Sequence, residues 1–285
     1  MIISLETARE RILGSFEKLP TFSILLNRLM ATLSHEDVSF RELAAIIETD
    51  AVLAGNLLRV VNSPLYGRQF TINSVRHAIA ILGSVKIRNL VLGLSLSGRW
   101  TDARVSNQWN PRQFNTHSVA VAVLSDLVAL ETPVPYPEGA FTAGLLHDVG
   151  KLLIAVATPE TFESLFDIYA TCGDAANDAE LEIVGVTHAE ISGAIARKWN
   201  LPTPIQEAVA HHHSPGQAAP NQIHLAHIVQ AADYYTNSLG LGMPPYRHHP
   251  VNSFEPSGIA FGLGERILKL AETFQVEFEG FRTFC

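Results

Sequence analysis

Helix-start signals recur along the whole sequence, and they limit the chain to a helical fold more than any other feature does. Ser39 precedes Glu42 by three residues, an arrangement in which a hydroxyl and a carboxylate each bind a backbone amide at the start of a helix. Thr187-His-Ala-Glu190 and Thr203-Pro-Ile-Gln206 repeat the arrangement, and Asp50 is placed to cap the helix that follows it. Each signal predicts that a helix begins there.

Apolar residues follow these signals at the spacing of a helix face, and no segment alternates apolar and polar residues as a half-buried strand does. Thr158 and Pro159 predict another helix start, because proline is favoured at the first helical position. Helices are also predicted over residues 74–82, 84–94, 112–131, 138–157, 221–238 and 262–274. The predicted fold class is therefore all-α.

The length of the chain allows one large domain or two lobes. It has 285 residues, and 47% of them are hydrophobic, enough to bury a substantial core. Residues 99–113 are polar and rich in turn formers, which indicates a joint between lobes. We therefore predict a two-lobed helical bundle with a first lobe at 1–108 and a second at 109–285.

The net charge of −8 argues against binding to a nucleic-acid backbone. Residues 51–112 nevertheless hold eight basic residues and one acid, a net +7, so the remainder carries −15. These basic residues either solvate helices or form a face that binds an anion or a partner. We see no long apolar run or secretion signal, and two cysteines make no disulfide framework, so we expect a cytoplasmic protein without a membrane span.

A histidine–aspartate pair stands out in the predicted helix 138–157. His147 and Asp148 are adjacent, so their side chains project about 100° apart on a helix and can reach one metal ion. Lys151 lies four residues after His147, on the same face, where its ammonium can hold a phosphate oxygen. Taken alone, the pair is also compatible with a surface feature that has no role.

Further metal-binding residue types occur on the neighbouring predicted helices. His117 lies on the preceding long helix, His188 in the first turn of a capped helix, and His212 and His213 at the end of the helix that starts at Thr203. Asp233 lies in an apolar run, where an unpaired buried carboxylate is costly and a metal ion relieves that cost. Each residue alone is equally explained as a satisfied core side chain, whereas the set favours a shared centre.

The order His117, His147-Asp148, Asp233 resembles the ligand pattern of the HD superfamily of metal-dependent phosphohydrolases. His188 and the pair His212-His213 resemble the wider ligand set of its HD-GYP branch, which uses two or three metals, often iron, to hydrolyse cyclic di-GMP. The resemblance implies one metal on His117, His147, Asp148 and Asp233, with Asp148 bridging to a second on His188, His212 and His213. It gives Lys151 and Asp148 the catalytic roles. No Gly-Tyr-Pro follows His213, which separates this chain from the HD-GYP pattern.

The first lobe resembles the narrower HDOD (HD-related output domain) family. The motifs that carry this resemblance are Leu19-Pro20, Ile46-Ile47-Glu-Thr-Asp50, Leu57-Leu58-Arg59, Asn62-Ser63-Pro64, Tyr66-Gly67, Ala78-Ile79 and Leu82-Gly83. Many HDOD proteins have lost ligands and act as regulatory output modules of bacterial signalling, with kinases or response regulators as partners. In this chain every ligand position that we can match is filled.

Three hypotheses follow. The first is a regulatory signal-transduction module with a mono- or dinuclear metal site, acting through protein contacts. The second is an active metal-dependent phosphodiesterase or phosphohydrolase acting on a nucleotide or cyclic dinucleotide, and the third is a nucleotide sensor without turnover. Imidazole and carboxylate ligands suit iron, manganese, nickel or zinc, and the resemblance favours iron.

Overall fold

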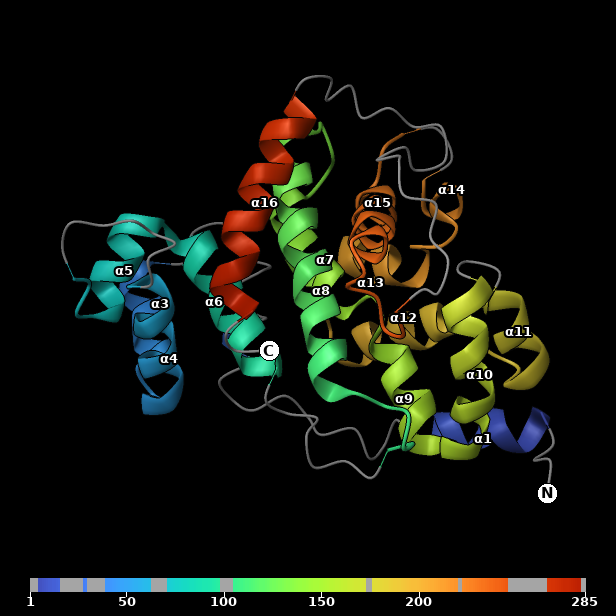
Figure 1. The fold of residues 1–285 in the computed structure, drawn as a ribbon. Helices are drawn as coiled ribbons and strands as arrows, with labels where there is room; N and C mark the ends of the chain where they lie inside the picture. The colour runs from blue at the N-terminus through green and yellow to red at the C-terminus, as the bar shows by residue number, and fades with distance from the viewer. Residues whose placement is uncertain are drawn as a thin grey trace. The chain divides into compact units, whose positions relative to one another are not determined.

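The computed structural model describes residues 5–15, 28–29, 39–62, 71–97, 105–172, 176–219, 222–245 and 266–282. Within these ranges every regular element is a helix and no strand occurs (Figure 1). The predicted all-α fold class is confirmed.

The chain forms two compact units. Unit 1 comprises Met1–Thr21 and Thr101–Leu263, and unit 2 comprises Phe22–Trp100 and Gly264–Cys285. Helix α1 (Leu5–Ser15) packs against α9 (Val149–Ala157) in unit 1, and α16 (Arg266–Arg282) packs against α6 (Ser84–Ser97) in unit 2. Unit 1 thus includes the N-terminal residues and unit 2 the C-terminal residues, unlike the predicted lobes at 1–108 and 109–285. The division into those two lobes stays a prediction.

In the described part of unit 2, α6 and α16 occur together with three shorter helices, α3 (Phe40–Ile47), α4 (Ala51–Val61) and α5 (Val75–Leu82). Its core holds Leu57, Ile79 and Ile87, each fully buried. Asn62 ends α4, and its amide group exchanges two 2.7 Å hydrogen bonds with the backbone of Ile72. These bonds tie the end of α4 to the segment that leads into α5.

Several helix starts follow the predicted caps. The Ser39 hydroxyl accepts the Glu42 amide at 3.1 Å, and Asp50 Oδ1 accepts the Val52 and Leu53 amides, both at 3.0 Å. Thr187 and Glu190 form the complete reciprocal arrangement. Capping by the side chains of Ser39, Asp50 and Thr187 is confirmed, and for the Ser39–Glu42 pair the structure shows the hydroxyl half of the predicted reciprocal arrangement.

Unit 1 consists of α1 and the helices from α7 to α15. Their bounds are α7 (Pro111–Glu131), the short 3-10 helix η4 (Pro137–Gly139), α8 (Ala140–Leu146), α9, α10 (Pro159–Cys172), α11 (Ala176–Ile183), α12 (His188–Lys198), α13 (Thr203–Ala210), α14 (Pro215–Ala218) and α15 (Leu225–Ser238). Helix α7 packs against α8 and α15, while α12 packs against α9 and α13. Because α8 and α13 also contact each other and α15, these helices surround one common region of unit 1.

Helices α7 and α8 approach each other closely at Gly144. A Cβ atom at this position would lie 2.8 Å from the Cα atom of Ala122 and 2.9 Å from the Ser125 hydroxyl. Glycine is therefore required for this approach, which sets the distance between the two helices that carry His117 and His147.

The structure corrects some local predictions. The helix predicted over 138–157 is interrupted, since α8 ends at Leu146 and α9 begins at Val149. The capping arrangement predicted at Thr203 is wrong, because Thr203 is the first helical residue and Gln206 Nε2 instead donates to the Leu201 carbonyl at 2.6 Å. Helix α6 extends past residue 94 to Ser97, and α15 begins at Leu225 rather than at 221. Helix α16 extends to Arg282, beyond the predicted end at 274.

One apolar stretch was missed in the sequence. Residues Pro137–Ala157 contain an 18-residue window with a mean hydropathy of 1.4, so by length and composition this stretch is able to cross a membrane. Because the window includes Asp148 and Lys151, it is not an unbroken apolar run, and the expected absence of a membrane span stays a prediction. In the structure 83% of this window is buried, as in the core helices of folded proteins, so the run is only weak evidence for a membrane span.

Parts of the motifs that resemble HDOD proteins lie outside the described residues. These parts are Leu19-Pro20, Ser63-Pro64 and Tyr66-Gly67. The basic residues Arg68, Arg99 and Arg104 also lie outside the described residues. The predicted joint at 99–113 is described only from residue 105 onward.

Candidate metal centre

Unit 1 brings together all seven residues predicted as metal ligands. They come from five places in the fold: His117 from α7, His147 and Asp148 from the break between α8 and α9, His188 from the first position of α12, His212 and His213 from the turn after α13, and Asp233 from α15. Six of the seven side chains are buried, and His213 is partly exposed. Their role as ligands remains a prediction, whereas their proximity is a property of the fold.

His117, His147 and Asp148 form the first group, with ligand atoms within 4.8 Å of one another. The Nε2 atoms of His117 and His147 both lie 3.5 Å from Asp148 Oδ2. Asp233 completes the group, because its Oδ1 lies 3.1 Å from His117 Nε2 and 3.6 Å from His147 Nε2. Two imidazoles and two carboxylates therefore face one small space.

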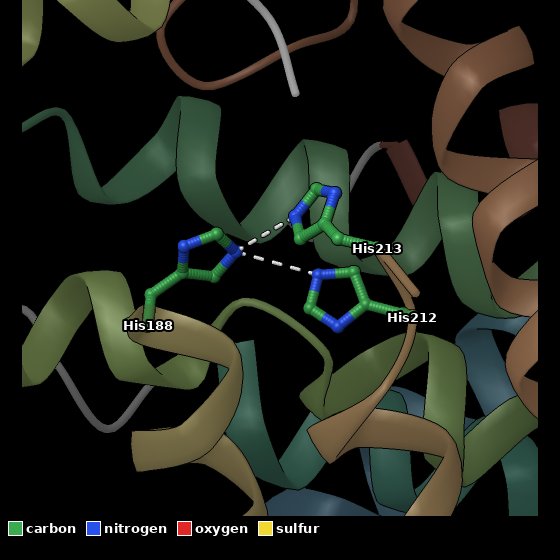
Figure 2. Close-up of side chains that lie close together, drawn as sticks. All are labelled: His188, His212 and His213. Atoms are coloured by element: carbon green, nitrogen blue, oxygen red, sulfur yellow. Dashed lines mark hydrogen bonds between the residues drawn. The ribbon is translucent and has the colours of Figure 1, made fainter. Parts of the chain in front are cut away.

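His188, His212 and His213 form the second group (Figure 2). The Nε2 atom of His188 lies 3.3 Å from that of His212 and 3.0 Å from that of His213. Asp148 connects the two groups, since its Oδ1 lies 3.2 Å from His188 Nε2 while its Oδ2 faces the first group. The carboxylate is thus placed to bridge two cations.

The break between α8 and α9 explains how the side chains of His147 and Asp148 reach this centre. The backbone at Asp148 departs from helical geometry, with φ −99° and ψ 7°. The Nδ1 atom of His147 lies 2.7 Å from the Gly144 carbonyl, which turns the ring toward the centre. The sequence prediction assumed a regular helix here; the break instead places the two side chains.

Gly150 lets α9 approach the start of α12. Its amide donates to the Ser192 hydroxyl at 2.9 Å, and a Cβ atom here would lie 2.0 Å from the His188 carbonyl oxygen. A contact that short is not possible for a side chain, so glycine is required where the chain passes His188.

Outer hydrogen bonds hold two of the candidate ligands. Asn237 Nδ2 donates to Asp233 Oδ1 at 2.8 Å from the next turn of α15. The buried Glu180 carboxylate of α11 accepts from the His188 ring and backbone, and from the Tyr169 hydroxyl. Sequence analysis missed Glu180, Tyr169 and Asn237. For Asn237 the signal was its spacing of four residues from Asp233, whereas Glu180 and Tyr169 carry no local signal.

The electrostatics of the centre couple its imidazoles to its carboxylates. Burial alone lowers the pKa of His117, but its hydrogen bonds to Asp148 and Asp233 outweigh burial and raise that pKa to about 9. For His188, burial is likewise outweighed by the Glu180 charge, and the pKa is about 9. Burial together with the neighbouring charge of His213 holds the pKa of His212 well below its usual value.

The carboxylates of the centre are held ionised. Burial opposes this, yet the charges of His147 and Lys151 keep the pKa of Asp148 well below its usual value. Lys151 Nζ donates to Asp148 Oδ2 at 2.7 Å, and burial notwithstanding, the charge of Asp148 raises the lysine pKa. Lys151 is therefore a cation held next to the carboxylate that joins the two groups.

The tautomer of His147 shows that the residues fit a metal ion. A backbone carbonyl only accepts, so the contact with Gly144 places a ring proton on Nδ1, and the neutral ring that binds a metal ion then has its lone pair on Nε2. That Nε2 atom is buried and makes no hydrogen bond, and it faces Asp148 Oδ2 and Asp233 Oδ1 at 3.5 and 3.6 Å. In the neutral ring this lone pair is directed at two carboxylates, an arrangement that is unfavourable unless a cation lies between them.

Comparison with known proteins places the chain in a family. The family model for the HDOD domain matches residues 19–215, and the chain therefore belongs to the HDOD family. The predicted family is confirmed.

Several solved structures share the fold. An HDOD domain protein of unknown function from Geobacter sulfurreducens superposes with a TM-score of 0.77 at 24% identity, covering 99% of both chains. A proposed signal transduction protein from Marinobacter aquaeolei gives a TM-score of 0.73 at 17% identity, covering 99% of this chain and 67% of that one. A proposed phosphohydrolase from Shewanella amazonensis gives 0.70 at 22%, covering 96% and 98%. At these identities the likeness shows the fold.

Two relatives by sequence are longer than this chain. An uncharacterized protein of Treponema pallidum is 25% identical over 99% of this chain, which spans 54% of that protein's length. Ribonuclease Y of Thermus thermophilus is 32% identical over 117 residues, which are 41% of this chain and 15% of that enzyme.

Proposed function

We propose that this HDOD protein is a cytoplasmic regulatory protein of bacterial signal transduction whose unit 1 binds two divalent transition-metal ions. The observation that carries the metal site is the pair of ligand groups joined by Asp148, with the buried Nε2 atom of His147 facing two carboxylates without a hydrogen bond. Membership of the HDOD family and the fold shared with a proposed signal transduction protein support the signalling role. Its partners in this proposal are kinases or response regulators.

The proposed donor sets differ between the two groups. His117, His147, Asp148 and Asp233 would hold one ion, and His188, His212 and His213 would hold the other, with Asp148 shared. Nitrogen and carboxylate oxygen donors suit iron, manganese, nickel or zinc, and iron is the first choice.

The metal content of the purified protein tests the metal-binding part of this proposal. Elemental mass spectrometry after anaerobic loading with iron or manganese is expected to give two equivalents per chain. A chain that takes up no transition metal under these conditions would refute the metal site. For the signalling part, purified kinases and response regulators of the source bacterium are tested for binding, and the absence of any complex counts against it.

Metal binding is expected to release protons. In the metal-free protein His117 and His188, each with a pKa raised to about 9, carry protons at pH 7, and a metal ion displaces them because it binds only neutral imidazole. The apparent metal affinity therefore rises as the pH increases from 6 to about 9 and changes less above that value. Titration calorimetry at pH 7 in two buffers of different ionisation enthalpy measures the release. Equal heats in both buffers would contradict it.

Hydrolysis of a phosphodiester is the second candidate function, and Lys151 favours it. Bound metal ions lower the pKa of a coordinated water from about 16 toward 7 and so supply a nucleophile at neutral pH. Lys151 Nζ, held 2.7 Å from the bridging Asp148, would bind a phosphate oxygen and offset developing negative charge. A nucleotide or a cyclic dinucleotide is the proposed substrate class.

Lys151→Met tests that candidate. The variant keeps the apolar stem, so it is expected to retain both metal equivalents while the rate of hydrolysis of bis(p-nitrophenyl) phosphate falls about a hundredfold. Exposed Lys198, at the end of α12, gives the control variant Lys198→Met, whose rate should match the wild type. If the metal-loaded wild type does not hydrolyse the ester, the regulatory role is the hypothesis that remains. If the protein binds a nucleotide without hydrolysing it, a sensor is indicated.

A further inference from the structure

Glu180 is a buried carboxylate that lies outside both ligand groups. The described hydrogen bonds of its two oxygens are with Tyr169 and His188. Glu180 lies on α11 with no exposed surface. Its Oε1 accepts from the Tyr169 hydroxyl at 2.5 Å and lies 2.7 Å from His188 Nδ1. Its Oε2 accepts from the His188 backbone amide at 2.6 Å and lies 2.9 Å from the same Nδ1. Both oxygens are thus used to hold one histidine.

These contacts set the orientation and the tautomer of His188. The carboxylate accepts at Nδ1, so a ring proton is held there, and in the neutral ring the Nε2 lone pair faces His212, His213 and Asp148. The backbone bond fixes the first residue of α12 at the same time. Because one carboxylate accepts from both the ring and the backbone amide, rotating the ring away from the centre would break its bond to Glu180.

Two other histidines of the ligand groups are held differently. His147 Nδ1 lies 2.7 Å from the Gly144 carbonyl and His212 Nδ1 lies 2.9 Å from the Val209 carbonyl. Both partners are neutral backbone groups three residues earlier in the chain. A carboxylate partner instead adds a full negative charge and makes the ring a stronger donor to a metal ion.

Charge explains why the second group needs this carboxylate. The first group has the two carboxylates Asp148 and Asp233, whereas the second has three imidazoles and only the shared Asp148. Two divalent cations a few ångströms apart repel each other, and the group with fewer anionic ligands binds its cation less tightly. Glu180, in contact with His188, supplies the missing negative charge to that side.

We propose that Glu180, oriented by Tyr169, is a positioning residue that enables the His188–His212–His213 group to hold its own metal ion. This inference rests on the proposed metal-binding function. It assigns Glu180 no contact with the metal or with a substrate, so its effect passes through His188. The second equivalent of metal depends on it, while the first does not.

Glu180→Gln is the direct test, since glutamine has nearly the same shape but no charge. The wild type is expected to bind two equivalents of Co²⁺, and the variant should bind the first with unchanged affinity and the second about ten- to a hundredfold more weakly. Visible absorption of the Co²⁺-loaded protein reports each equivalent separately and needs no enzymatic activity. Glu182→Gln, on the exposed side of the same helix, is the matched control and should behave as the wild type.

Tyr169→Phe provides a second, milder variant in case Glu180→Gln does not fold. It keeps the carboxylate and removes only the hydroxyl bond to Oε1, so the second equivalent should weaken by a smaller factor than in Glu180→Gln. Unchanged binding of both equivalents in the folded variants overturns the role of Glu180 and leaves the metal site intact. Equal weakening of both equivalents also overturns it, because Glu180 then acts on the whole unit. A wild type that binds no Co²⁺ refutes the metal site and this inference together.

Discussion

Asp148→Asn is expected to remove both metal ions, the largest effect of any single substitution in this protein. Asp148 is the carboxylate that faces both groups, with Oδ2 at 3.5 Å from His117 and His147 and Oδ1 at 3.2 Å from His188. Asparagine keeps the shape but loses the charge and presents one acceptor oxygen instead of two. We expect metal affinity to fall by at least about a hundredfold, which corresponds to about 2.7 kcal/mol.

Elemental mass spectrometry and Co²⁺ titration of the Asp148→Asn variant measure this loss. Asp178→Asn is the matched control, because Asp178 is an exposed carboxylate on α11 and its loss should leave both equivalents in place. Two tightly bound equivalents in Asp148→Asn would show that Asp148 does not join the two groups. Retention of one equivalent would show that it serves a single group.

Gly150→Ala is expected to destabilise unit 1 strongly. The added Cβ atom would lie 2.0 Å from the His188 carbonyl oxygen and 2.9 Å from the His188 Cα atom, and both are backbone atoms that cannot turn aside. Overpacking of this kind costs about 3 kcal/mol. For a unit of this size that cost lowers the melting temperature by roughly 6–12 °C.

Thermal unfolding followed by circular dichroism checks the Gly150→Ala prediction. The matched control is Gly216→Ala in α14, where nothing lies within 4 Å of an added Cβ atom and no loss of stability is expected. Because the clash pushes on His188, the metal-free and metal-loaded proteins should both be affected, and metal binding to the second group should weaken. A melting temperature equal to that of the wild type would mean that α9 and α12 move apart at little cost.

Local signals in the sequence predicted much of the fold correctly. The caps at Ser39, Asp50 and Thr187 lie where their hydroxyl and carboxylate groups were expected to bind backbone amides. Such signals are short-range, since a cap and the amides that it binds are three residues apart or fewer. The prediction failed at Thr203, where the preceding Pro202 takes the cap position instead.

The residues of the candidate metal centre were also predicted from the sequence. The residues His117, His147, Asp148, His188, His212, His213 and Asp233 were chosen from the sequence, and the structure brings all of them together within unit 1. The prediction was possible because the types and the order of these residues resemble the ligand pattern of a known family. Metal titration of the purified protein tests whether they act as ligands.

The sequence by itself determined the all-helical class, the family and the set of residues that meet at the centre. Only the tertiary structure decided that the helix breaks at His147–Asp148, that Gly150 lies against the His188 backbone, and that Glu180 holds His188. The physical reason for Gly150 and Glu180 is that their contacts join different helices, whereas caps and periodicity report only on the helix in which they lie. Helical periodicity and capping are set by neighbouring residues, whereas a buried carboxylate finds its partner only when α10, α11 and α12 have packed.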